Sequence, residues 1–398
     1  MGTLHRQRAR GTEVYSFEFD TEWLARGDAL TLDPDLLPVP GRTYPPGPRA
    51  QFGIFMDSAP DRWGRTLMQR RETVLASKEA RPTRTLTEWD YLLGVHDHSR
   101  LGALRFRADP RAPFLDNSAV NAAPPLTSLR ALQDAARALE EDRLESVAQL
   151  DAVLEQLLAP GSSLGGSRPK ASVVDEHGHL CIAKFPSRED QWDVGAWEAL
   201  AHRLAAKVGM RVPPMRTIRF TSDGRTFISR RFDRTGRGGR LAFVSAMTLL
   251  QRSDGDRDAS YLDLIDLLQS RGAQTRIDCE ELFRRVVFSI CISNTDDHLR
   301  NHGFFVEPTG LVLSPAYDIN PNPHKDHLSL SIDEADTSLN LETARAAGAT
   351  YGLKESRVAE LIGEVRDAVA GWRCEADDLG ISRREQEMMG RAFLACER

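Results

Sequence analysis

A polar segment in the last third of the chain, Ser293-Asn294-Thr295-Asp296-Asp297-His298-Leu299-Arg300-Asn301, indicates the fold class. It follows an apolar stretch, residues 282–292, with the composition of a buried helix. Polar groups directly after a buried helix cost stability unless they are paired or needed for function. Asp296 and Asn301 are five positions apart, which is the spacing of the catalytic Asp and the metal-binding Asn in protein kinases. The His-Arg-Asp triplet of eukaryotic kinases is absent, because Asn294 and Thr295 precede Asp296.

A second acidic residue follows at the end of a predicted strand. Apolar residues 311–313 lead into Ser314-Pro315-Ala316-Tyr317-Asp318, which predicts a turn that presents Asp318. Asp318 lies 22 residues after Asp296, and this order fits the second metal-binding residue of a kinase. A single Asp at a strand end is more often a turn former, so its position after Asp296 and Asn301 is what favours the metal role.

A glycine-rich stretch, residues 161–170, predicts a tight turn whose backbone N–H groups point at an anion. It lacks the Gly-Lys-Ser/Thr ending of a Walker A loop, and alone it also fits a surface loop. Residues 175–179 then predict a hairpin turn, and residues 180–185 predict the returning strand. That strand contains Lys184, and a lysine in an apolar strand must be paired, face a ligand or reach solvent from an edge.

These elements in this order predict the nucleotide-binding lobe of a kinase, where the strand lysine holds ATP phosphates. Such a lysine needs a glutamate on the next helix, and Glu198 lies near the start of the predicted helix 197–207. A glutamate in a helix is by default solvated, so only the context favours a pair between Lys184 and Glu198.

The remaining pattern predicts four parts: an accessory subdomain (1–107), a Pro-rich linker (108–126), a nucleotide-binding lobe (127–235) and a helical lobe (236–398). In the accessory part we expect strands at 15–19 and 102–106 and a helix from Asp61 to Leu75. Ser128 is expected to cap the next helix. Near the C-terminus, apolar residues recur at helical spacing, and they are Val358, Leu361, Ile362, Val365, Val369 and Trp372.

The composition is that of a soluble globular protein, with 41% hydrophobic and 28% charged residues. A net charge of -6 disfavours direct, non-specific binding to nucleic acid. The five cysteines form no Cys-x-x-Cys pair, so we expect reduced thiols. We see no secretion signal and no run of 18 apolar residues, which predicts a cytoplasmic protein without membrane contact.

At this point the chain resembles the HipA family of serine/threonine kinase toxins, and the similar motifs occur in the family's order. Residues 294–301 resemble its Asp-x-His-x-Lys-Asn catalytic segment, and residues 314–318 its metal-binding Tyr-Asp element. Further similar segments are the glycine loop Ser163-Leu164-Gly165-Gly166-Ser167-Arg168-Pro169-Lys170, the strand Ala183-Lys184-Phe185-Pro186, the hinge Arg231-Phe232-Asp233-Arg234, and the accessory segments Asp57-Ser58-Ala59-Pro60-Asp61-Arg62-Trp63-Gly64-Arg65 and Gly102-Ala103-Leu104-Arg105-Phe106.

The resemblance implies an α+β, bilobed protein-kinase-like fold related to phosphoinositide kinases, with a mixed α/β accessory subdomain and an all-helical C-terminal lobe. It implies an ATP- and Mg²⁺-dependent toxin that is bound by a helix-turn-helix antitoxin and reaches DNA, and hence the nucleoid, only through it. The implied substrate is a translation component such as an aminoacyl-tRNA synthetase. Autophosphorylation of Ser163, or of the adjacent Ser162, would restrain activity.

Roles follow residue by residue. Backbone amides of Gly165, Gly166, Ser167 and Arg168 would hold phosphates beside Ser163 and Leu164, and Lys184 would hold the α- and β-phosphates with Glu198 as its partner. Asn301 and Asp318 would bind Mg²⁺, Asp296 would accept the proton of the substrate hydroxyl, His298 would brace the loop, and Arg231 and Phe232 would meet adenine.

The family's Glu-x-Glu helix motif is here Ala196-Trp197-Glu198, so Glu198 is the one remaining candidate. The family also has a strand before the segment like Gly2-Thr3-Leu4, so we expect a trimmed accessory subdomain. Two alternatives stay open. One is a nucleotide-binding corepressor with little catalysis. The other is a metal-dependent phosphohydrolase that uses Asp296, Asp297, His298 and Asp318.

Overall fold

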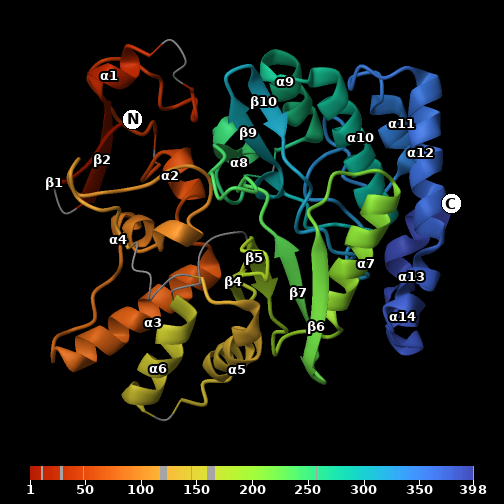
Figure 1. Cartoon of the computed structure of the whole chain (residues 1–398). Coiled ribbons are helices and arrows are strands. Elements are labelled where there is room, and N and C mark those ends of the chain that lie inside the picture. Colours follow the sequence, from red (N-terminus) through yellow and green to blue (C-terminus); the bar gives the residue numbers. More distant parts are fainter. Residues whose placement is uncertain are drawn as a thin grey trace. The chain divides into compact units, whose positions relative to one another are not determined.

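The computed structural model describes residues 1–9, 12–26, 30–47, 49–116, 123–144, 146–158, 166–256 and 258–397 (Figure 1). The chain forms two compact units. The first contains residues 1–188, 233–251 and 306–308, and the second contains residues 189–232, 252–305 and 309–398. The four parts expected at 1–107, 108–126, 127–235 and 236–398 stay predictions.

The first unit begins with an antiparallel sheet of β1 (Gly2–Ala9), β2 (Thr12–Phe19) and β3 (Arg42–Thr43), in that order. The strand expected at 15–19 is therefore confirmed as part of β2. Phe17 pairs with Leu4 on one side and Thr43 on the other, and its ring lies 5.6 Å from that of Phe55 in α2 (Gly53–Asp57). A short helix, α1 (Thr21–Leu24), follows β2.

Four helices complete this region, and they are α3 (Arg62–Lys78), α4 (Glu88–Leu93), α5 (Leu129–Glu140) and α6 (Val147–Leu158). The helix predicted from Asp61 is confirmed, and Asp61 is its N-cap, accepting a hydrogen bond from Gly64 N at 2.8 Å. Helix α6 packs against both α3 and α5 (Figure 1). Ser128 is the N-cap residue of α5, as predicted, but its side chain makes no capping hydrogen bond.

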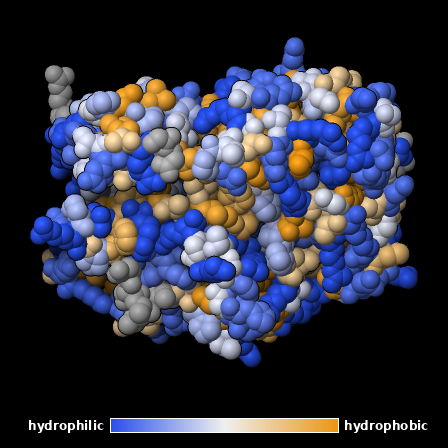
Figure 2. Space-filling view, turned by 45° about the horizontal axis from the view of Figure 1, so that its top comes forward, coloured by the Kyte–Doolittle hydropathy of each residue, from blue (hydrophilic) through white to orange (hydrophobic). Residues whose placement is uncertain are grey.

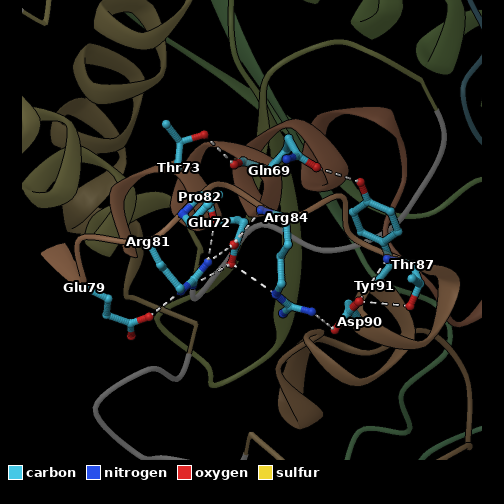
Figure 3. A network of polar contacts seen from close by, with 10 residues as sticks. All are labelled: Gln69, Glu72, Thr73, Glu79, Arg81, Pro82, Arg84, Thr87, Asp90 and Tyr91. Carbon is cyan, nitrogen blue, oxygen red and sulfur yellow. Dashed lines mark hydrogen bonds and ion pairs between the residues drawn. The ribbon is translucent and has the colours of Figure 1, made fainter. Parts of the chain in front are cut away.

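The turn between α3 and α4 is held by a polar network around Glu72, which is buried (Figure 3). Glu72 accepts hydrogen bonds from the side chain of Arg81 and, at 3.2 Å, from the backbone of Arg84. Arg84 also donates to Asp90 at 2.9 Å, and Asp90 with Thr87 forms the capping box of α4. The network therefore fixes the start of α4 relative to α3.

The segment 102–106 is not the strand that the sequence predicted. Gly102 has a φ of +70° and donates its backbone N–H to Asp233 Oδ2 at 2.8 Å, so a side chain takes the bond that a strand partner would take. The adjacent Arg100 is fully buried and donates to the carbonyls of Ser58, Leu92 and Val95 at 2.8–3.0 Å. Burial lowers the pKa of Arg100 to about 9, which still leaves it charged at neutral pH.

An antiparallel hairpin of β4 (Lys170–Val174) and β5 (Leu180–Lys184) follows in the same unit, as the sequence predicted for residues 175–185. The unit also contains β8 (Phe243–Ser245) and α8 (Ala246–Leu249). Asp57 joins this part to α2, because it accepts hydrogen bonds from Ser245 N at 2.8 Å and from Thr248 Oγ1 at 2.9 Å.

In the second unit, α7 (Val194–Lys207) covers a hairpin of β6 (Met215–Thr221) and β7 (Gly224–Arg230). The Asp193 side chain caps α7 through Ala196 N and also accepts from Arg225 N at 2.8 Å. Gly195 is required here, since a Cβ at that position would lie 2.1 Å from Arg225 O.

The rest of this unit is mostly helical, with α10 (Thr275–Cys291) at its centre in contact with α9 (Tyr261–Arg271) and α12 (Glu355–Ala370) (Figure 1). Strands β9 (Gly303–Glu307) and β10 (Gly310–Leu313) are hydrogen-bonded neighbours. The other helices are α11 (Leu341–Ala347), α13 (Trp372–Asp378), α14 (Arg383–Met389) and α15 (Leu394–Glu397). The apolar face predicted for residues 358–369 is buried in α12, and Trp372 belongs to α13.

Polar side chains cover most of the surface shown in Figure 2. Among the described residues, no helix is long and apolar enough to cross a membrane. The five cysteines all lie in described segments and form no disulfide.

Candidate active site

The predicted catalytic segment is a braced loop at the end of α10. Ser293 turns the chain with a φ of +49° and donates from Oγ to Ala392 O at 2.8 Å. Ser329 Oγ donates to Thr295 O at 2.8 Å, so the loop is also held from the side of residues 319–340. Because its backbone is tied at these points, the loop presents its side chains in a fixed arrangement.

Asp296 and Asn301 are joined within this loop. Asn301 Nδ2 donates to Asp296 O at 3.1 Å, across a short 3₁₀ turn at Leu299–Asn301. The Asp296 side chain is exposed, whereas Asn301 is buried. An amide that donates through Nδ2 presents Oδ1 as an acceptor, which is the atom that could bind a metal ion. The exposed carboxylate of Asp296 is accessible to a substrate from solvent, whereas the buried amide of Asn301 is held within the protein.

Asp297 has a structural role that the sequence reasoning missed. It is buried, with Oδ2 accepting from Tyr261 at 2.7 Å and Oδ1 lying 2.9 Å from His302 Nε2. Burial by itself raises the pKa of Asp297, but His302 and the hydrogen bond from Tyr261 outweigh it and lower the pKa. A carboxylate engaged on both oxygens braces the loop, which weakens the alternative in which Asp297 binds a catalytic metal.

The metal segment, residues 314–320, is positioned by α10. Asp278 accepts the Leu313 backbone N–H at 2.9 Å, and Arg285 donates to Ser314 O at 2.6 Å. Asp318 follows with a φ of +58°, the left-handed region in which Asp and Asn are tolerated better than most residues. Asn320 Nδ2 lies 3.4 Å from Asp318 Oδ1, so the carboxylate is oriented by its own turn.

Two hydrogen bonds join the metal segment to the catalytic segment. Asn320 N donates to Asn294 Oδ1 at 3.1 Å, and Tyr317 Oη donates to Arg300 O at 2.6 Å. The structure thus brings together the two segments that contain Asp296, Asn301 and Asp318. Oxygen atoms of carboxylate and amide groups are the ligands that Mg²⁺ prefers, so the residues of this region fit that ion.

Within the part of the chain that the structure describes, no three His, Cys, Asp or Glu side chains are grouped as a metal site. Asn301 and Asp318 supply only one carboxylate between them, as expected for an ion that is also bound by substrate phosphates. His298, predicted to brace the loop, is half-buried and N-terminal to the 3₁₀ turn.

The predicted hinge has two structural parts. Arg231 is buried, and the Phe232 ring lies 5.4 Å from that of Tyr317, directly before Asp318. The other half of the motif serves the first unit, where Arg234 donates to Arg100 O at 2.6 Å and Asp233 accepts from Gly102 N. The resemblance assigned Arg231 and Phe232 to adenine, which stays a prediction, and the structure gives the next two residues, Asp233 and Arg234, an anchoring role in the first unit.

The glycine loop is described from Gly166 onward; Ser163, Leu164 and Gly165 lie outside the described residues, as does Ser162. Gly166 has a φ of +88°, and Ser167 is exposed. Arg168 follows and leads to β4. Lys184 is half-buried at the end of β5, and Glu198 is buried in α7. The pair between Lys184 and Glu198 stays a prediction.

Comparison with known proteins bears on this arrangement. Residues 162–372, just over half of the chain, match the HipA-like C-terminal domain. The chain belongs to this family. The matched region contains Lys184, Asp296, Asn301 and Asp318, so the family match covers the residues that the sequence assigned to chemistry.

Two relatives illustrate the family. A "Putative kinase" of Haemophilus influenzae is 24% identical over 188 residues, covering 41% of this chain and 54% of the relative. This chain therefore spans about half the length of that curated relative. The HipA toxin of Shewanella oneidensis MR-1, solved with HipB and operator DNA, matches with a TM-score of 0.71 and 17% identity, over 100% of this chain and 94% of that chain. This likeness shows a mixed α/β fold shared with the HipA toxin.

The Helicobacter pylori proinflammatory kinase CtkA matches more weakly, with a TM-score of 0.39 over 60% of this chain. A TM-score this low does not establish a shared fold.

Proposed function

We propose that this protein is an ATP- and Mg²⁺-dependent serine/threonine protein kinase that acts as the toxin of a toxin–antitoxin pair. The observation that carries the proposal is the junction of the two polar segments through Asn294–Asn320 and Arg300–Tyr317. It supports the proposal because an exposed Asp, a buried Asn and a second Asp lie in two segments that are hydrogen-bonded to each other, and phosphoryl transfer uses residues of these types. The family membership supports the same chemistry.

In the proposed reaction, Asp296 would orient a substrate hydroxyl and accept its proton as the hydroxyl oxygen bonds to the γ-phosphorus of ATP, while the bond from that phosphorus to the bridging oxygen breaks and ADP leaves. Asn301 and Asp318 would hold Mg²⁺, and this ion would neutralise part of the negative charge on the phosphates. Lys184 and the backbone of Gly166 to Arg168 would hold the phosphates, with Glu198 orienting Lys184. Phe232, packed on Tyr317, would offer an apolar surface to the adenine ring.

The bilobed kinase fold related to phosphoinositide kinases and the regulation of the protein belong to the same proposal. The solved HipA toxin is bound to HipB and operator DNA, which favours an antitoxin partner here and contact with DNA through that partner. The proposed substrate is a translation component such as an aminoacyl-tRNA synthetase. Autophosphorylation at Ser163 or Ser162 would restrain the enzyme, and the proposed location is the cytoplasm.

The test is incubation with labelled ATP and Mg²⁺, beside an Asp296→Asn variant. Because Asp296 is exposed, the variant should fold normally and lose only the proton acceptor. Label on protein serine or threonine that disappears in the variant supports the kinase. Release of phosphate without a labelled protein would favour the phosphohydrolase, and tight ATP binding without turnover would favour the corepressor.

A further inference from the structure

The base of the glycine loop contains a buried ion pair to which the proposed mechanism gives no role. Lys170 Nζ lies 2.6 Å from Asp61 Oδ2, and the two side chains are 4% and 7% exposed. The same ammonium donates to Gly166 O at 3.3 Å, inside the glycine loop. Asp61 Oδ1 is meanwhile occupied by Gly64 N as the N-cap of α3. A single carboxylate therefore ties the rigid start of α3 to the glycine loop.

A second contact strengthens this connection. Trp63 is buried in the first turn of α3, and its Nε1–H donates to Lys170 O at 3.1 Å. Arg65, one turn further, fixes the same helix start by donating to Pro60 O at 3.2 Å and to both oxygens of Glu88. Lys170 is thus held at its backbone and at its ammonium by a helix end that is itself anchored.

The position of Lys170 in the hairpin adds an electrostatic argument. Lys170 is the register partner of Lys184. Phe185 N donates to Pro169 O at 2.8 Å, so Lys170 and Lys184 form the next, non-hydrogen-bonded pair, in which side chains approach most closely. Like charges directly opposite each other repel. Asp61 neutralises the Lys170 side of this pair, beside the lysine assigned to the phosphates.

We propose that Asp61 is a positioning residue for ATP: its ion pair with Lys170 holds the base of the glycine loop and draws the Lys170 ammonium away from Lys184, so that repulsion does not displace Lys184. The inference rests on the proposed function, because it takes the glycine loop and Lys184 as the phosphate-binding elements. Asp61 touches no reacting atom. Its expected effect is therefore on ATP affinity and on the order of the loop, and not on the chemical step.

The first variant is Asp61→Asn, which keeps an N-cap acceptor and removes the charge. We expect KM for ATP to rise roughly tenfold or more, with kcat at saturating ATP little changed. The matched control is Glu72→Gln, which neutralises another buried carboxylate of α3 that pairs with Arg81 and Arg84 (Figure 3). The control should lower stability without raising KM. An equal rise in KM for Glu72→Gln would overturn the proposal.

A double variant separates positioning from stability. Replacing a buried ion pair by neutral residues is often tolerated, whereas removing one partner is not. Asp61→Asn with Lys170→Met should therefore recover much of the lost thermal stability but keep the raised KM, since the bond to Gly166 O is gone. Recovery of KM together with stability would show that the pair is only structural.

Hydrogen exchange does not depend on catalytic activity, so it can test the role of Asp61 separately from the proposed kinase function. Hydrogen exchange of the backbone amides of residues 166–172 should be faster in Asp61→Asn than in the native protein, and unchanged in Glu72→Gln. Faster exchange in an inactive protein would reject the kinase and retain the anchoring by Asp61. Unchanged exchange and unchanged KM in an active protein would reject the role of Asp61 and retain the kinase.

Discussion

Asn294 Oδ1 accepts a hydrogen bond from the backbone N–H of Asn320, 26 residues further along the chain, at 3.1 Å. The same side chain donates from Nδ2 to Ser289 Oγ at 3.3 Å, so Asn294 connects the end of α10, the catalytic loop and the metal segment. Asn294 lies two residues before Asp296, and its partner Asn320 lies two residues after Asp318. This hydrogen bond therefore fixes the position of one carboxylate segment relative to the other.

Asn294→Ala should therefore reduce turnover more than stability. Loss of its two hydrogen bonds costs about 2 kcal/mol, a fraction of the free energy of unfolding. The relative displacement of the two segments should lower kcat roughly tenfold or more. Steady-state kinetics and thermal unfolding check this. Asn294→Asp, which keeps the acceptor for Asn320 N, should retain more activity than the alanine variant, and equal activity of the two would contradict the prediction.

Asp318→Asn should weaken Mg·ATP binding while leaving the fold intact. The left-handed backbone at position 318 tolerates Asn as well as Asp, and the variant replaces the one charged ligand of the proposed metal site by a neutral amide. Calorimetry with Mg·ATP and with ATP alone measures the effect. A Mg²⁺ dependence equal to that of the native protein would remove Asp318 from the proposed metal site.

Removal of the Asp297 carboxylate should mainly lower the free energy of unfolding. Asp297→Ala leaves His302 and Tyr261 buried without their partner, which typically costs about 3–5 kcal/mol for a broken buried pair. Tyr261→Phe removes one hydrogen bond and should cost about 1 kcal/mol. Urea unfolding measures both. A stable but inactive Asp297→Ala protein would instead give Asp297 a chemical role.

The Glu72 network should make stability depend on pH in the acid range. The hydrogen bond from Arg81 is the main reason that the pKa of Glu72 falls from 4.5 to about 2 in the folded protein. A lowered folded-state pKa stabilises the protein fully above the unfolded value, and this contribution disappears as pH falls through the folded value. The difference in unfolding free energy between native protein and Glu72→Gln should be constant above about pH 4.5 and shrink toward pH 2. A difference that does not change with pH would exclude this contribution.

Local structure could be predicted from the sequence where interactions between neighbouring residues determine it. The helix start at Asp61 follows from its own capping bond to Gly64, and the hairpin that contains Lys184 follows from its turn residues and alternation. The proximity of the segments around Asp296 and Asp318 followed from their similarity to kinase motifs. The hydrogen bonds that produce it join residues far apart in sequence, and no local pattern indicates them.

Long-range side-chain contacts explain what was missed. The segment 102–106 has strand-like composition, but Asp233, 131 residues away, takes the Gly102 N–H. Asp296 was assigned by its spacing from Asn301, whereas the role of Asp297 follows only from its burial against Tyr261 and His302.

The contacts of Asp61 and Trp63 with Lys170 have a consequence for which fragments of this protein can fold. The region that matches the family begins at residue 162, yet Lys170 obtains its buried counter-charge from a helix about a hundred residues earlier. A fragment starting near residue 127 would lack the carboxylate that pairs with Lys170 and would expose the surface that Trp63 covers. The N-terminal hundred residues are thus an integral part of the first unit, and proteolytic loss of that segment should destabilise the hairpin that contains Lys170.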